Sequence, residues 1–178
     1  MNERYCTTGQ FEKLGHGFRQ HCGPTALTNL VLTLRPEATS GAGGAETPED
    51  LFLRLARLGQ RRLNYVNLKL PFRLGGTSDL LCRSYLRAAL RESGLRDAEA
   101  GPRRRATPQS LRAALRRGSL VYLQLRRHPR YGSHHLLCYG LDPDGSLRLA
   151  DGWTDEPVRL APGELGRAWM IEISLSNK

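Results

Sequence analysis

Hydrophobic positions in the first half of the chain recur with the period of a helix. One apolar face, spaced at i, i+3, i+4 and i+7, consists of Leu27, Leu30, Val31 and Leu34. This spacing predicts a helix over residues 25–34 that ends at Arg35 and Pro36. Pro24 suits its first turn, since a backbone N–H there would have no helical partner. Residues 37–46, rich in Gly and Ala, predict a flexible connection.

Start and stop signals predict three more helices. Thr47 with acidic residues behind it begins one that runs to about residue 58. Residues 75–79 start another that ends at Ser93-Gly94, and Thr107-Pro108 begins a short one that Gly118 closes. Residues 63–74 fit either a strand or an extended loop.

From residue 120 onward the period changes to two. Alternation over 120–125 predicts a strand, and residues 134–140, which begin with two histidines, are predicted to form a second. The turn sequence of residues 142–145 returns the chain into a third strand over 147–150. Further strands are expected at 158–160 and 169–173. Helices followed by a mostly antiparallel sheet predict an α+β fold, and the length of 178 residues fits a single domain over 1–178.

The net charge of +10 raises the question of a nucleic-acid partner. Only three of the 27 basic residues are lysines, and the arginines are spread over the predicted helices rather than gathered in one stripe. Aromatic residues make up 7% of the chain and offer few platforms for stacking bases. These features argue against nucleic-acid binding and favour a solvated basic surface that attracts acidic partners.

Targeting signals and paired cysteines are not evident. The N-terminus lacks the basic start and apolar stretch of a secretory signal, and no apolar run reaches membrane-spanning length. The four cysteines, Cys6, Cys22, Cys82 and Cys138, have no short paired spacing, which predicts reduced thiols in a cytoplasmic protein without a membrane span.

Cys22 is the candidate nucleophile, because it stands at the mouth of the first predicted helix. The unpaired N–H groups and the dipole of a helix N-terminus favour a thiolate. Gly23 would let a substrate approach the backbone closely, and nearby N–H groups would face a tetrahedral oxyanion. The alternative is a buried structural thiol.

A base for Cys22 is expected from the strand that begins with His134 and His135. Side chains alternate along a strand, so only one of the two is expected to face the helix mouth. Asp151 ends the next strand, where its carboxylate can hold an imidazole by the second nitrogen. Alternatively, one of the two histidines packs in the core and the other lies on the surface. For Asp151 the alternative is a residue that merely forms a turn. No Cys/His spacing typical of zinc appears, and we predict neither a metal nor a cofactor.

Three segments resemble the motifs of papain-like cysteine peptidases, in particular the group similar to bacteriocin-leader-processing (double-glycine) peptidases. They are residues 22–26, Gly132-Ser133-His134 with its apolar strand, and residues 149–152. In that family the histidine stands six residues before a glycine and about seventeen before the aspartate. His134 has both spacings, to Gly140 and to Asp151, whereas His135 has neither. The likeness covers residues 16–32 and 118–152, and Gly76-Thr77 loosely.

This resemblance implies a fold and a mechanism. The fold would place the nucleophile at a helix N-terminus that packs on a C-terminal antiparallel sheet. Cys22 would attack a peptide or amide carbonyl, His134 would act as base and acid, and Asp151 would orient His134. The thioester would be resolved by water, or by an amine or thiol in a transferase.

The oxyanion site departs from the family pattern. The family's oxyanion glutamine usually stands about six residues before the cysteine, where this chain has His16, and Gln20 stands two residues before. Either Gln20 reaches inward by another path, His16 replaces it as donor, or backbone N–H groups suffice. This departure motivates an alternative, a papain-like binding module without turnover; an Arg-rich nucleic-acid binder is less favoured. The resemblance also implies a free-standing protein or a separate transporter or other protein partner.

Overall fold

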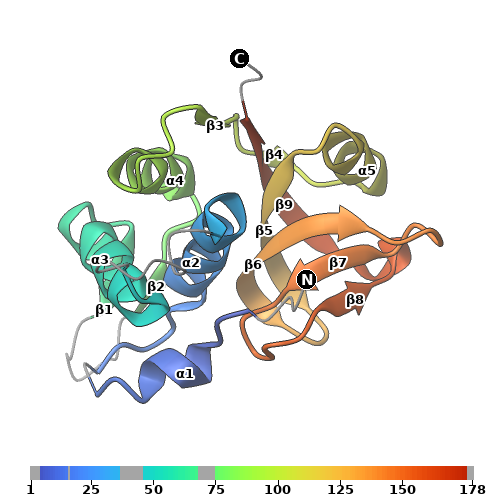
Figure 1. The fold of residues 1–178 in the computed structure, drawn as a ribbon. Coiled ribbons are helices and arrows are strands. Elements are labelled where there is room, and N and C mark those ends of the chain that lie inside the picture. The colour runs from blue at the N-terminus through green and yellow to red at the C-terminus, as the bar shows by residue number, and fades with distance from the viewer. Residues whose placement is uncertain (1–4, 16, 37–45, 68–74, 176–178) are drawn as a thin grey trace.

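The structure, a computed structural model, describes residues 5–15, 17–36, 46–67 and 75–175. Its α+β architecture places helices at one side of a large sheet and a further helix on the opposite face (Figure 1). The helices are α1 (Thr8–Glu12), α2 (Cys22–Leu34), α3 (Pro48–Arg61), α4 (Cys82–Glu92) and α5 (Pro108–Arg116). The strands are β1 (Tyr65–Asn67), β2 (Gly75–Thr77), β3 (Ala98–Ala100), β4 (Arg104–Arg105), β5 (Leu120–His128), β6 (Gly132–Leu141), β7 (Leu147–Ala150), β8 (Val158–Leu160) and β9 (Arg167–Leu175).

The main sheet is antiparallel throughout its described pairs. Its order is β3-β9-β5-β6-β7-β8, and β4 also pairs with β9. A separate pair, β1 with β2, lies beside α2 and α3. The pairing of β6 with β7 begins only at Leu137, opposite Ala150. Residues 132–136 of β6 therefore pair with β5 alone and leave their other edge open.

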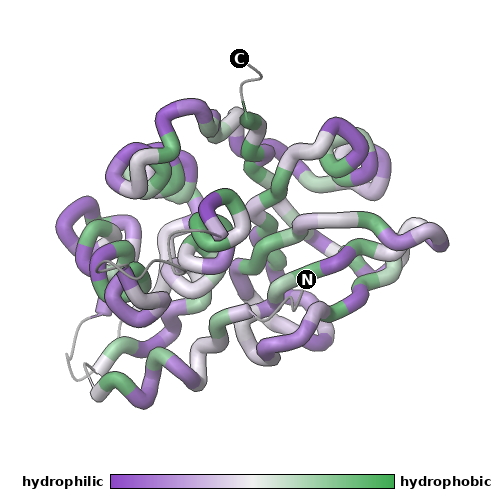
Figure 2. The backbone as a smooth tube through the Cα atoms, viewed as in Figure 1, coloured by the Kyte–Doolittle hydropathy of each residue, from purple (hydrophilic) through white to green (hydrophobic). Residues whose placement is uncertain are grey.

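The two faces of the sheet bury different helices. Tyr122 and Leu137 point toward α2 and α4, whereas Leu123 and Leu136 point toward α5, as the period of two predicts. In Figure 2 the outer turns of α3, α4 and α5 are polar, and apolar residues alternate with polar ones along the strands of the sheet. Leu27 of α2 is fully buried, and burial of such a side chain stabilises the fold by about 1.5–3 kcal/mol.

Most of the predicted elements are confirmed, with shifted boundaries. Helix α2 begins three residues before the predicted start at residue 25 and so includes Cys22. Thr47 caps α3 and Thr107 caps α5 through their side chains. Residues 75–77 form β2 rather than the start of a helix, and α4 begins only at Cys82. Most of the connection expected over 37–46 lies outside the described residues.

Three elements, α1, β3 and β4, lie where the sequence predicts neither a helix nor a strand. Each has at most five residues, which is too short to display a period. In the described part of the chain, no helix combines the length and the apolar character needed to cross a bilayer.

Candidate active site

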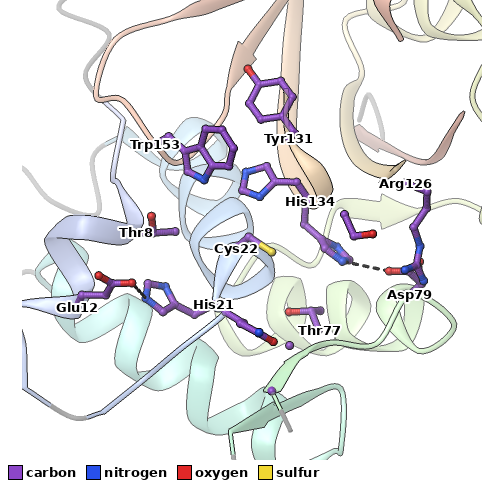
Figure 3. A pocket seen from close by; sticks show the side chains of 15 residues that line it. Thr8, Glu12, His21, Cys22, Thr77, Asp79, Arg126, Tyr131, His134 and Trp153 are labelled. Carbon is purple, nitrogen blue, oxygen red and sulfur yellow. Dashed lines mark ion pairs between the residues drawn. The ribbon is translucent and has the colours of Figure 1, made fainter. Parts of the chain in front are cut away.

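A cavity of about 510 Å³ opens where α2 begins, bordered by β2, the start of β6 and the segment that follows β7. Figure 3 shows the Cys22 sulfur pointing into it, with Trp153 and His134 on one side and Thr77 on the other. Segments far apart in sequence thus bring a thiol and imidazoles to one cavity. Cys22 and His134, which were predicted from separate segments of the sequence, both line this cavity.

The N-terminus of α2 holds Cys22 against the β1–β2 pair. Cys22 is the first residue of the helix and is partly exposed. Gly23 follows it, and a Cβ atom at Gly23 would lie only 2.1 Å from Oγ1 of Thr77. Only glycine therefore permits this close approach, which fixes one wall of the cavity beside the thiol.

Burial raises the pKa of the Cys22 thiol above its ordinary value. Hydrogen bonding from the backbone N–H groups of His135, Gly23 and Cys22 itself acts in the opposite direction, and the negative charge of Asp79 adds to the increase. The helix N-terminus alone therefore does not produce a thiolate, contrary to the simplest sequence argument. A neighbouring base is needed to take the proton.

His134 lines the cavity with one ring nitrogen that makes no hydrogen bond to a described residue. Its Nε2 lies 2.6 Å from the main-chain oxygen of Asp151. A carbonyl can only accept, so Nε2 carries the hydrogen and Nδ1 keeps its lone pair. Within the described residues Nδ1 has no hydrogen-bond partner, and the ring is stacked with Tyr131 at an interplanar angle of 9°. Burial lowers the pKa of His134 below its ordinary 6.5, so the ring is a neutral base at neutral pH.

His135 has both ring nitrogens engaged. Nε2 lies 3.1 Å from the carboxylate of Asp79, and Nδ1 lies 3.0 Å from the hydroxyl of Tyr122. Burial acts to raise the pKa of Asp79, but hydrogen bonding and charge from His135 and Arg126 bring it below its ordinary value. His135 therefore forms a fixed pair with Asp79 rather than a free base beside Cys22.

The expectation that only one of the two histidines faces the helix mouth is wrong. They do point to opposite faces of the sheet, but both line the cavity. The pairing of β6 with β7 begins only at Leu137, so no β7 residue is paired with either histidine. Alternation along a strand sends neighbouring side chains to opposite faces of the sheet, but it does not exclude either side chain from a cavity at an unpaired edge.

The carboxylate of Asp151 does not hold His134, which corrects the predicted contact. Its oxygens accept from the backbone N–H groups of Trp153 at 2.8 Å and Thr154 at 3.1 Å, and from the Tyr131 hydroxyl at 3.2 Å. An aspartate side chain readily caps the turn that follows it, and a buried carboxylate needs such donors. Asp151 thus positions His134 through its main-chain oxygen.

Replacement of Asp151 by asparagine is expected to change turnover by no more than about threefold, because the amide oxygen still accepts from Trp153 and Thr154. A triad carboxylate that does hold the imidazole loses about 10⁴-fold on the same change. Turnover of an activated ester by Asp151→Asn, compared with the unaltered protein, measures the difference. A loss approaching the larger figure would contradict the main-chain role.

The expected oxyanion donors are only partly described. His16 lies outside the described residues. Gln20 lines the cavity and adopts a left-handed backbone, with φ of 48°, which is uncommon for a residue other than glycine. Its side-chain oxygen sits against Gly75 and Gly76, 3.4 and 3.5 Å from where their Cβ atoms would lie. Gln20 therefore reaches the cavity despite its shifted position in the sequence.

Asp79 is the functional candidate that sequence reasoning missed. Its place after Thr77-Ser78 matches a helix start, and that local signal hid its pairing with His135. Among the described residues, no group of three or more His, Cys, Asp or Glu side chains converges to hold a metal ion.

No protein-family model matches the chain, and no curated protein does.

Proposed function

We propose that this protein is a papain-like cysteine hydrolase that cleaves a peptide or other amide through a thioester at Cys22. The observation that carries the proposal is the shared cavity, which is lined both by a thiol at a helix N-terminus and by His134, whose Nδ1 makes no hydrogen bond to a described residue. The α+β fold with α2 packed on the sheet is compatible with it.

The proposed reaction uses these groups in sequence. His134 Nδ1 takes the Cys22 proton as sulfur attacks the carbonyl carbon, and the C=O electrons move to oxygen. Backbone N–H groups at the start of α2, with Gln20, stabilise that oxyanion. The imidazolium then gives its proton to the leaving amine as the C–N bond breaks. Water, deprotonated by His134, cleaves the thioester and restores the thiol.

The substrate class and the setting belong to the same proposal. A peptide or amide substrate is favoured over an ester because a general acid is provided for the amine. All four cysteines are unpaired thiols, which supports a reducing compartment such as the cytoplasm. A separate transporter or other protein partner would supply the substrate.

Acylation by p-nitrophenyl acetate tests the proposal. We expect one acetyl adduct by intact mass, mapped to Cys22, and none in Cys22→Ser. Cys6, Cys82 and Cys138 serve as internal controls because they are buried. Burial raises the pKa of each of these thiols to about 12. If Cys22 stays unmodified in the folded protein, the hydrolase proposal fails, and a binding module without turnover takes its place.

A further inference from the structure

A second cavity of about 490 Å³ adjoins the first and is strongly basic. The two share Asp79, Arg126 and Ser133 as lining residues. We call this second cavity the arginine cleft. Its cationic residues are Arg103, Arg126, Arg127 and Arg167. The cleft thus continues from the space around Cys22 into a concentration of positive charge.

Two of these arginines lie directly opposite each other on neighbouring strands of the sheet. Arg126 of β5 is the register partner of Arg167 of β9, and like charges directly opposite destabilise a sheet. Gln124 and Trp169, two residues earlier and later, form the next pair on the same face. The Arg103 guanidinium stacks over the Trp169 ring at 4.2 Å and brings a third cation to that face.

The arginine cleft contains too little negative charge to balance its arginines. Asp79 is the single carboxylate among the described lining residues, set against four arginines. It is already shared by Arg126, by Arg103 at 4.0 Å and by His135. Arg127 and Arg167 make no ion pair with any described residue, and both are exposed. An anionic group entering the cleft would relieve this repulsion and gain charge-assisted hydrogen bonds.

We propose that the arginine cleft binds an acidic side chain of the peptide substrate and so selects peptides with a carboxylate close to the cleaved bond. This rests on the proposed function in one respect, that the adjoining cavity receives the peptide. Leu80, 82% exposed at the rim, offers an apolar contact that a peptide would use. A nucleic acid is less favoured because Trp169, the one aromatic among the described lining residues, is covered by Arg103.

Peptide binding to the Cys22→Ala protein tests the proposal without turnover. The probes are two fluorescein-labelled hexapeptides of alanine and leucine, one with two central glutamates and the other with glutamines in their place. Fluorescence anisotropy should give a Kd at least about tenfold lower for the glutamate peptide, and added salt should reduce the difference.

The matched variants then locate the effect. Arg127→Gln with Arg167→Gln should bring the preference to about twofold or less, and leaves the partners of Asp79 in place. Arg57→Gln with Arg62→Gln removes the same charge from exposed positions on and just after α3 and should retain the full preference.

Three results would overturn the proposal: equal affinity for the two peptides, an equal loss in the α3 control, or tighter binding of a single-stranded oligonucleotide that the cleft variants abolish. The experiment is independent of the thiol, because the protein tested lacks it. A glutamate preference together with failed acylation of Cys22 would sustain the cleft and reject the hydrolase.

Discussion

Replacing His134 by glutamine is expected to lower steady-state turnover of an activated ester by about a thousandfold, the contribution typical of a positioned general base. Glutamine can still donate to the main-chain oxygen of Asp151, the acceptor that His134 Nε2 uses at 2.6 Å. It cannot take a proton from the Cys22 thiol or from the water that cleaves the thioester. Fold and contact are therefore retained while the base is lost.

The matched control is His135→Gln, in the same strand and at the same cavity. Both nitrogens of His135 are committed, to Asp79 and to Tyr122, so its loss should cost about tenfold or less through disturbed positioning. Acylation and deacylation rates by intact mass, with circular dichroism to check folding, measure both variants. The reverse order, with His135→Gln the more damaging, would assign the base to His135 instead.

Gly23→Ala is expected to destabilise the protein by about 1–3 kcal/mol and to impair acylation of Cys22 as well. The new Cβ would lie 2.1 Å from Thr77 Oγ1 and 2.6 Å from Thr77 Cβ, so β2 must move away from the start of α2. That movement displaces the wall of the cavity beside the thiol. Urea unfolding measures the stability, and p-nitrophenyl acetate measures the acylation rate.

Two further variants separate this steric effect from a general loss of glycine. Gly163→Ala adds a methyl group where no atom lies within 4 Å, and should leave both quantities unchanged. Combining Gly23→Ala with Thr77→Gly removes the clashing side chain and should recover much of the acylation rate. If the double variant acylates as slowly as Gly23→Ala alone, the contact with Thr77 does not shape the site.

The sequence predicted the placement of Cys22 well because the relevant signals are local. An apolar period and Pro24 locate the start of α2 within three residues. The hairpin of β6 and β7 likewise brings His134 close to Asp151. Whether the side-chain carboxylate or the main-chain carbonyl of Asp151 faces the His134 ring depends on the conformation of the turn after Ala150. The hydrophobic pattern of a strand carries no information about that turn.

The Asp79–His135 pair was not predictable in the same way. Its two residues belong to β6 and to the segment between β2 and α4, and no period or motif links them. The arginine cleft was not predictable for the same reason. The cross-strand pairing of Arg126 with Arg167 depends on the register of β5 and β9, which their separate sequences do not specify.

The coupling of Cys22 to His134 is tested most directly by the pH dependence of iodoacetamide alkylation at Cys22, read by mass spectrometry, in the unaltered protein and in His134→Gln. In the unaltered protein the rate should rise as His134 loses its proton, and burial lowers the pKa of that ring below 6.5. In the variant the thiol must ionise alone, and burial raises its pKa above 9.0, so the rise should move to higher pH. Coincident profiles in the two proteins would contradict a Cys22–His134 pair.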